Sequence, residues 1–128
     1  TSKKELLKFY IEINKLKIKL LDLLKKIKSK KKIIHGYGAS TKGNVLLQYF
    51  GIGNKYIDYI SERNQNKFGL YTPGTKIKII SEKDSRKKNP DYYLVLPWHF
   101  KKEILIREKK IRSTGTKFIF PLPDLKVY

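Results

Sequence analysis

A chain of 128 residues, 40% of them hydrophobic, is long enough for one domain with one hydrophobic core and too short for two. The absence of cysteine excludes disulfide bonds and thiolate metal sites, and no carboxylate cluster accompanies either histidine, so we expect no metal. Neither a signal peptide nor an apolar run long enough to span a membrane is visible, and we expect a cytoplasmic protein.

The net charge of +19 makes a nucleic acid or an anionic membrane surface the first partner to consider. The excess is almost entirely lysine, because the chain has only four arginines, and proteins that read bases rely on the arginine fork. We therefore interpret most of the charge as solvated surface and expect no membrane partner. A basic nucleic-acid-binding module is kept as the alternative function.

The first predicted element is a helix from Ser2 to about Lys28. Its apolar residues recur every three or four positions, and Ser2 with Glu5 matches a capping box at its start. One row consists of Leu6, Phe9, Ile13, Leu16, Leu20, Leu23 and Ile27. A second row, Leu7, Ile11, Ile18, Leu21 and Leu24, makes the apolar stripe wider than a solitary surface helix requires. The helix should therefore pack on a sheet, on a preceding domain, or on a second copy, which would make the chain an oligomerisation domain.

Residues 33–44 predict a short strand, a glycine turn and the start of a helix. Gly36 and Gly38 allow positive φ and a close approach of the main chain to a ligand. The free N–H groups at the start of a helix attract anions, and three side chains add donors there. These side chains belong to Ser40, Thr41 and Lys42. A diphosphate is the ligand that this turn suits best.

The spacing of the glycines departs from both common phosphate-binding motifs. A dinucleotide fingerprint has its third glycine three residues after the second, whereas Gly43 follows Gly38 by five. A P-loop needs lysine directly after a glycine, whereas Lys42 precedes its glycine. The alternative is a tight strand-to-helix turn whose glycines serve only packing.

The rest of the chain alternates strands and helices. The helix that begins near Thr41 should bury Val45, Leu46 and Tyr49 and end at Gly51. Strands are predicted at 56–61, 76–80, 91–96 and 117–120, with a helix or loop at 81–89 and a helix at 100–112. This alternation predicts an α/β fold with an open, mostly parallel sheet and helices on its faces. Ligands of such sheets bind at the carboxyl ends of the strands.

Two residues beyond predicted strands are candidates for ligand contacts. Glu62 follows Gly38 by 24 residues, close to the interval at which such folds place a carboxylate on a ribose hydroxyl. Its alternative role is an exposed ion pair with Arg63 or Lys67. Trp98 follows a buried strand and suits stacking on a flat base or sugar, with core packing as the alternative.

No catalytic constellation is visible in the sequence. The chain has no cysteine nucleophile and no serine in a nucleophile elbow, and its acidic residues are scattered. His35 lies within a predicted strand, where we expect a hydrogen-bonded core histidine. We interpret the chain as a binder of a phosphorylated ligand.

The order of several motifs closely resembles the C-terminal domain of S-adenosylmethionine-dependent sugar C-methyltransferases, from about Leu16 to Pro123. The motifs are residues 36–44, Tyr49-Phe50-Gly51-Ile52, Glu62-Arg63-Asn64 with Lys67-Phe68-Gly69 and Pro73-Gly74-Thr75, and Leu96-Pro97-Trp98. The resemblance implies a Rossmann-like domain that holds a nucleotide-diphosphate sugar. It also implies that a zinc-binding domain and a central methyl-transfer domain precede this domain in the same chain.

Carried over by residue, the resemblance implies a substrate-phosphate loop and a few nucleotide-side contacts. The loop is Gly36, Tyr37, Gly38, Ala39, Ser40, Thr41, Lys42 and Gly43, and the contacts are Glu62, Arg63 and Trp98. Glu62 departs from the aspartate expected there, and His99 stands where asparagine is common in the family.

The implied organisation is a connector helix at residues 1–31 and a Rossmann-like substrate-binding domain at 32–128. The chain has no methionine and begins at Thr1, so we expect a piece of a longer protein. The full-length protein would use S-adenosylmethionine, whereas this fragment should hold no cofactor and should not be catalytically active alone.

Overall fold

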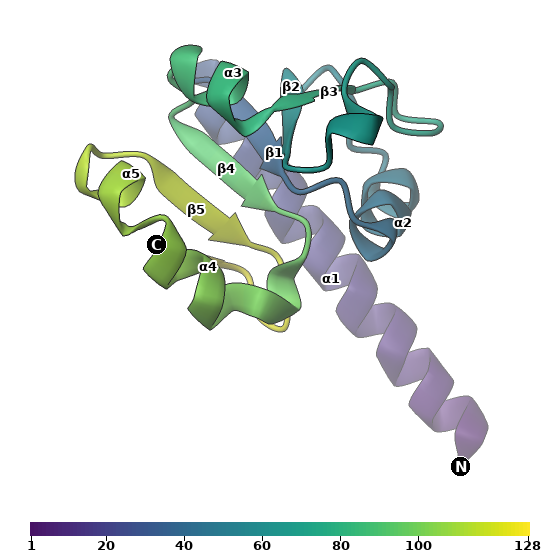
Figure 1. Cartoon of the computed structure of the whole chain (residues 1–128). Coiled ribbons are helices and arrows are strands. Elements are labelled where there is room, and N and C mark those ends of the chain that lie inside the picture. Colours follow the sequence, from purple (N-terminus) through teal and green to yellow (C-terminus); the bar gives the residue numbers. More distant parts are fainter.

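Six strands form one sheet in the computed structural model, which describes all 128 residues (Figure 1). The strands are β1 (Ile34–Tyr37), β2 (Tyr59–Glu62), β3 (Lys78–Ser81), β4 (Tyr92–Val95), β5 (Lys117–Phe120) and β6 (Lys126–Val127). Their order is β3-β2-β1-β4-β5-β6, and every pair is parallel except β5 with β6. This is the doubly wound order, with its switch point between β1 and β4, and it confirms the predicted α/β fold.

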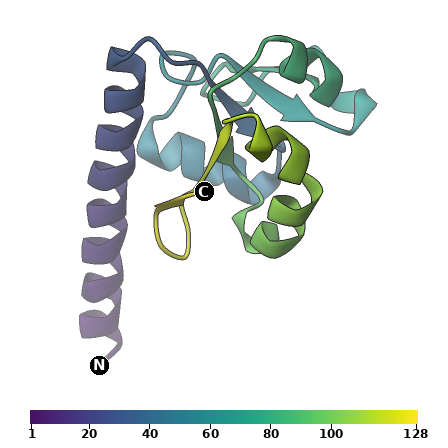
Figure 2. The same ribbon diagram turned by 90° about the vertical axis from the view of Figure 1, so that its left-hand side faces the viewer.

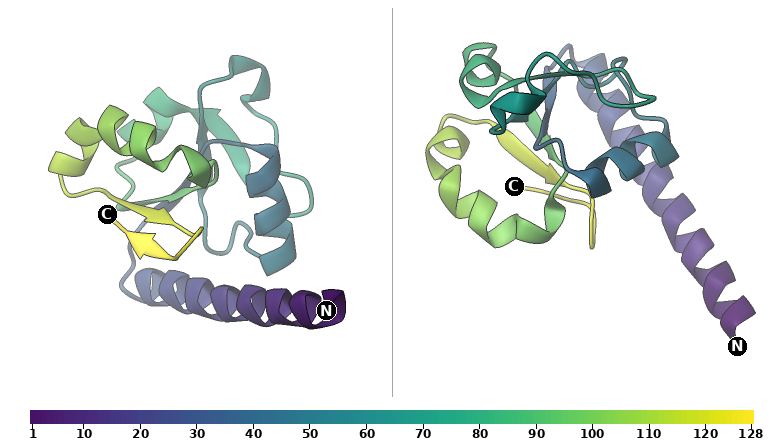
Figure 3. Two further views of the ribbon diagram at one scale, coloured as in Figure 1. Left: turned by 90° about the horizontal axis from the view of Figure 1, so that it is seen from below. Right: turned by 45° about the vertical axis from the view of Figure 1, so that its right-hand side comes forward.

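Helices cover both faces of the sheet (Figure 3). They are α1 (Ser2–Ser29), α2 (Thr41–Phe50), α3 (Glu82–Lys87), α4 (Lys101–Arg107) and α5 (Lys109–Ser113), with 3-10 turns η1 (Gln65–Lys67) and η2 (Trp98–Phe100). Because side chains alternate along a strand, Leu94 of β4 packs with α1 and α2, whereas its neighbour Tyr93 packs with α4. Ser85 of α3 hydrogen-bonds Tyr93, which places α3 on the α4 side.

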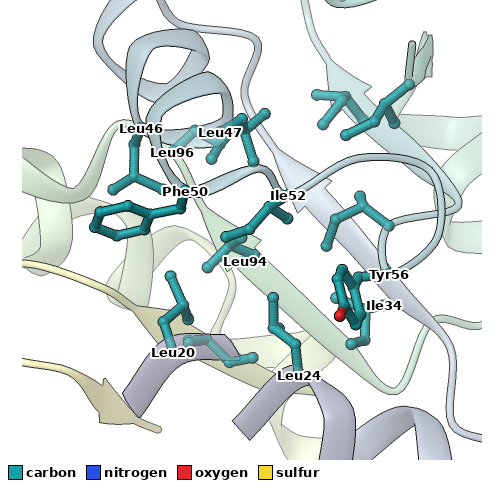
Figure 4. Packing of buried hydrophobic residues seen from close by; sticks show 14 of the residues in the cluster. Leu20, Leu24, Ile34, Leu46, Leu47, Phe50, Ile52, Tyr56, Leu94 and Leu96 are labelled. Atoms are coloured by element: carbon teal, nitrogen blue, oxygen red, sulfur yellow. The ribbon is translucent and has the colours of Figure 1, made fainter. Parts of the chain in front are cut away.

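The larger core lies between the sheet and the pair α1 and α2. Figure 4 shows Leu20 and Leu24 of α1 pointing towards Leu94, with Phe50 of α2 close by. Each such fully buried side chain contributes about 1.5 to 3 kcal/mol to folding relative to an exposed one. Residues 1–31 and 32–128 therefore share one hydrophobic core.

Residues 2–12 of α1 are exposed, and the rest of the chain covers the helix from Ile13 onwards, which packs against the core. Leu20 has no exposed surface, whereas Phe9, on the same apolar row, is 57% exposed. In Figure 2 the N-terminal end of α1 extends beyond the rest of the molecule. No helix is both long enough and apolar enough to cross a membrane.

The helix α1 begins at Ser2, as predicted, but its cap differs from the prediction. Thr1 is the N-cap, and its Oγ1 accepts a hydrogen bond from the N–H of Lys4 at 3.4 Å. Ser2 is the first helical residue, so Ser2 and Glu5 do not form the predicted capping box. Threonine and serine cap helices by the same chemistry, and the difference is a shift by one position.

The buried face of α2 also differs from its prediction. The helix buries Leu46, Leu47 and Phe50, whereas Val45 and Tyr49 are exposed. Successive helical residues are turned by about 100°, so the two exposed residues lie on the neighbouring face of the helix. The apolar stripe of α2 is thus wider than the sheet covers.

The C-terminal third of the chain differs from its prediction in two places. The helix predicted at 100–112 is divided into α4 and α5 at Glu108, whose side chain is buried. The two-residue strand β6 pairs antiparallel with β5 and was not predicted, because a segment so short has no periodicity.

Candidate functional site

A cavity of about 360 Å³ lies at the carboxyl ends of β1 and β2, next to the segment that follows β4. We call it the polar cavity. It lies at the switch point of the sheet, where doubly wound folds bind ligands. Eleven residues line it, and three of them are hydrophobic. The sequence-predicted residues among them are Tyr37, Gly38, Glu62 and Arg63.

The three glycines of the predicted loop have different roles. Gly38 has φ of +82°, the left-handed region that favours glycine, and it lines the polar cavity. A Cβ at Gly36 would collide with the side chain of Ile60, and one at Gly43 with that of Leu96. Gly36 and Gly43 are therefore explained by close packing of β1 on β2 and of α2 on the end of β4.

Part of the loop's hydrogen-bonding capacity is used within the protein. The N–H of Gly38 donates to the carbonyl of Ser61 at 2.8 Å, and the N–H of Ala39 donates to Glu62 Oε1 at 2.7 Å. Ala39 itself is buried. These two amides hold the loop to the end of β2, so they are not free to bind an anion.

The remaining loop donors lie at the start of α2. Ser40 is the N-cap, and its Oγ accepts the N–H of Gly43 at 3.1 Å, so this hydroxyl already caps the helix. The N–H of Ser40 has no acceptor within the protein. Thr41 and Lys42 are the first two helical residues, whose amides have no intrahelical acceptor, and both side chains are exposed. Of the predicted anion site, three consecutive amides and the Lys42 ammonium thus remain available to a ligand.

Glu62 is the last residue of β2, and backbone amides surround its carboxylate. Besides the Ala39 amide on Oε1, the N–H groups of Arg63 and Asn64 donate to Oε2 at 3.0 and 2.8 Å. Lys67, one of its predicted ion-pair partners, instead donates from Nζ to the carbonyl of Ala39 at 2.9 Å. Glu62 is therefore fixed on the cavity wall, with acceptor capacity left on Oε1.

A cluster of charged side chains next to the polar cavity was missed by sequence reasoning. Its centre is Glu108, which is 4% exposed. Tyr37 Oη donates to Glu108 Oε2 at 2.7 Å, and Arg86 Nη2 donates to Glu108 Oε1 at 3.1 Å. Arg107 contacts Tyr37 Oη and donates to Glu82 Oε2 at 2.7 Å. We call these five residues the polar cluster.

The amino-acid composition alone could have drawn attention to the polar cluster, because arginine is scarce in this chain. The chain has four arginines, and three of them, Arg63, Arg86 and Arg107, gather around Glu82 and Glu108. Tyr37 and Glu108 are 71 positions apart, so only the fold brings them together. Burial and the hydrogen bond to Glu108 raise the pKa of Tyr37 well above its usual range, so its hydroxyl stays a donor.

His35 lies on the same face of β1 as Tyr37 and confirms the expected core histidine. It is 1% exposed, and its Nδ1 is 2.7 Å from Ser85 Oγ, which in turn is 2.8 Å from Tyr93 Oη. Burial lowers the pKa of His35 to about 4, against a raising effect of Asp58. The ring is therefore neutral near pH 7 and belongs to the interior of the protein.

Charged side chains of both signs line the polar cavity. Arg63 and Arg107 face the carboxylates of Glu62, Glu82 and Glu103. Guanidinium groups bind phosphate or carboxylate oxygens, and carboxylates accept hydrogen bonds from hydroxyl groups. The cavity is thus suited to a ligand that carries both hydroxyls and an anionic group.

Trp98 and Lys42 line a second cavity, on the other side of the loop. This groove of about 380 Å³ lies between α1 and α2, and ten of its eleven lining residues are hydrophobic. We call it the apolar groove. Its lining consists of Phe9, Tyr10, Ile13, Leu16, Lys42, Val45, Leu46, Tyr49, Phe50, Trp98 and Leu122. The fold thus places Glu62 and Arg63 beside Tyr37 and Gly38 of the loop, and it places Trp98 on the other side, beside Lys42.

The sequence of the chain matches one family model and is similar to one curated protein. A family model described as the C-methyltransferase C-terminal domain matches residues 1–123. C-methyltransferase NovU of Streptomyces niveus is 34% identical over 119 residues, which make up 93% of this chain and 28% of NovU. The chain therefore spans little more than a quarter of the length of the curated relative it matches.

Proposed function

The chain belongs to the family of C-methyltransferase C-terminal domains, and on this premise we propose that it holds a nucleotide-diphosphate sugar for methylation by a longer enzyme. The observation that carries the proposal is the polar cavity at the switch point of the sheet, beside three open amides at the start of α2.

The diphosphate would lie against the start of α2. The amides of Ser40, Thr41 and Lys42 carry the partial positive charge of the helix terminus, and the Lys42 ammonium adds a full charge. Arg63 has a side chain that is 70% exposed, and its Nε is 3.9 Å from Glu82 Oε1. Because this ion pair is loose and exposed, Arg63 can turn to a phosphate oxygen at little cost.

The hydroxyl-bearing part of the ligand would occupy the polar cavity. Glu62 has acceptor capacity left on Oε1, and Glu103 offers a further carboxylate. Arg107 is held by Glu82 and Tyr37, so it presents a fixed donor rather than a mobile one. We leave Trp98 out of this site, because it lines the apolar groove.

The chemical contribution of this chain would be positional. A base in the preceding domain would remove a proton next to a keto group of the sugar. The resulting carbanion would attack the methyl group of S-adenosylmethionine there, and the sulfur would keep the electron pair of the broken C–S bond and leave as a neutral thioether. By fixing the diphosphate, the chain fixes the position of the reacting carbon. The two glycines explained by packing make the loop a rigid support for this task.

The methyl donor S-adenosylmethionine is assigned to the preceding domain. Neither cavity beside the loop fits it together with the substrate. The polar cavity is needed for the sugar, and the apolar groove has no carboxylate to accept hydrogen bonds from the donor's amino group or hydroxyls. The full-length protein, and not this chain, would therefore be the active methyltransferase.

The test is calorimetric titration of the full-length protein with nucleotide-diphosphate sugars at moderate salt. We expect Lys42→Ala and Arg63→Ala each to weaken binding about tenfold, since each removes a charge-assisted phosphate contact worth about 1.5 kcal/mol. Lys102→Ala and Lys83→Ala remove exposed charges that line neither cavity and serve as controls, with binding unchanged. Failure of every nucleotide sugar to bind, or equal effects of all four variants, would contradict the proposal.

A further inference from the structure

We propose that the apolar groove and the exposed apolar residues of α1 next to it form the docking surface for the methyl-transfer domain that precedes this chain in the longer enzyme. The inference rests on the proposed place of the chain within such an enzyme. The hydrophobic residues of the groove are not among those proposed to bind the nucleotide sugar, and Lys42 is the one residue common to both sites, so the docking surface and the substrate site can fail separately.

The apolar pattern of α1 exceeds what this chain covers. The core takes up Leu20, Leu24 and Ile27 in the C-terminal half of the helix. Six large hydrophobic residues of α1 remain exposed, namely Leu6, Leu7, Phe9, Tyr10, Ile11 and Ile18. Leu6 and Phe9 continue the stripe of the buried residues and Tyr10 borders it, so these three form one exposed apolar surface with the groove, and such a surface marks an interface. Leu7, Ile11 and Ile18 lie on the opposite face of the helix.

The second wall of the groove comes from α2. Val45 and Tyr49 are 60% and 53% exposed, although the apolar stripe of α2 includes both. With Phe9 and Tyr10 on the α1 wall, they leave an apolar concavity of about 380 Å³. A protein can fill such a concavity with protruding side chains, whereas the flat surface of a lipid bilayer cannot. The shape therefore favours a protein partner.

The comparisons indicate which protein partner occupies the apolar groove. The matching family model is that of a C-terminal domain, and the matched segment of NovU is 28% of NovU, so most of the relative lies outside it. A domain joined to the N-terminal end of α1 would stay beside the groove at high effective concentration. It could occupy the groove with an interface of the modest size, about 600 to 1,500 Å², that is usual between domains of one chain.

The positive charge of α1 indicates which residues should surround the apolar centre of the partner's surface. Lysine outnumbers acidic residues over positions 2–19 of α1, which carry Lys3, Lys4, Lys8, Lys15, Lys17 and Lys19 against Glu5 and Glu12. The partner should therefore present an apolar centre with acidic residues around it.

Docking at this surface has a consequence for the substrate site. Lys42 lies at the start of α2 and lines the groove, as does Trp98, which follows the end of β4. A domain seated in the groove would thus contact the same loop that borders the polar cavity. The reacting part of a sugar held at the carboxyl edge of the sheet would then lie near the domain boundary.

The test is hydrogen–deuterium exchange of the longer enzyme compared with the 128-residue chain, whose sheet and hydrophobic core are complete. We expect the amides of residues 4–15 to exchange at least tenfold more slowly in the longer enzyme. Phe9→Glu combined with Tyr49→Glu should restore fast exchange, because each would bury a charge in the interface. Both side chains are more than half exposed in the chain alone, so the variant should fold.

Ile106→Glu is the matched control, because Ile106 is 68% exposed and lies on α4, on the opposite face of the sheet. It should leave the slow exchange of residues 4–15 unchanged. Equal exchange in both proteins would overturn the proposal. Slow exchange of residues 4–15 in the 128-residue chain itself would also overturn the proposal in two cases. If the slow exchange depended on protein concentration, a second copy would be the occupant. If it required anionic vesicles, a membrane surface would be the occupant.

Discussion

The polar cluster buries a charged group, and the apolar groove leaves large hydrophobic side chains exposed, so each departs from the usual distribution of polar and apolar groups. In the polar cluster a carboxylate that is 4% exposed has its partners within the chain, in Tyr37 and Arg86. In the apolar groove Phe9 and Tyr49 remain more than half exposed, with nothing in the chain to cover them. The cluster is complete by itself, whereas the groove is not.

This difference separates what the chain needs for folding from what it offers to a partner. A buried polar group that lost its hydrogen bonds would destabilise the fold, so the residues of the cluster are tied to stability. An exposed apolar side chain contributes little to the stability of the chain that carries it. Substitutions in the two regions should therefore differ sharply in their effect on the isolated chain.

The largest contrast is expected within one apolar row of α1. Leu20→Ala should lower the free energy of unfolding of the 128-residue chain by about 3 to 4 kcal/mol, because it leaves a cavity in a fully buried site. Phe9→Ala removes a larger side chain but should change stability by less than about 0.5 kcal/mol. Urea denaturation measures both. A similar loss from the two variants would mean that the chain itself covers its groove.

The next largest effect concerns pH and the buried ring of His35. The folded protein keeps His35 neutral down to about pH 4, whereas the unfolded chain binds a proton near pH 6.5. The unfolded state thus holds more protons between these values, and stability should fall by roughly 3 kcal/mol as the pH drops from 6.5 to 4. His35→Gln should flatten this dependence in denaturation curves, and His99→Gln, at an exposed site, should not. An unchanged slope in His35→Gln would exclude His35 as its source.

The smallest of these effects concerns the centre of the polar cluster. Glu108→Gln should cost about 2 kcal/mol, since it replaces charge-assisted hydrogen bonds to Arg86 and Tyr37 by weaker neutral ones. The same change at Glu103, an exposed residue on the rim of the polar cavity, should cost less than about 0.5 kcal/mol. Thermal unfolding of the two variants checks this. Equal costs would mean that the cluster does not stabilise the fold.

The features that the sequence predicts well are local. The segment from β1 through the turn to α2 follows from its glycines and its apolar period, and Gly51 ends α2 in the left-handed conformation with φ of 67°. The mostly parallel sheet with helices on both faces follows from the alternation of strands and helices, whereas the strand order was not predicted. His35 could be assigned to the core because it lies within an apolar strand.

The features that it does not predict depend on contacts distant in sequence. Glu62 binds the amide of Ala39, 23 positions away, and Glu108 binds Tyr37, 71 positions away, and no periodicity encodes either contact. The apolar stripe of α2 indicates which residues seek burial, but not that Val45 and Tyr49 find no cover in this chain. Trp98 follows β4 as expected, yet the side of the loop on which it lies depends on the packing of α1 and α2.

The most direct test of the central claim is a nuclear magnetic resonance titration of the ¹⁵N-labelled 128-residue chain with nucleotide-diphosphate sugars. If the start of α2 binds the diphosphate, the amide signals of Ser40, Thr41 and Lys42 should shift most, followed by those around Glu62 and Arg63. Saturable shifts confined to the lysines of α1, or no shift at all up to millimolar ligand, would contradict it.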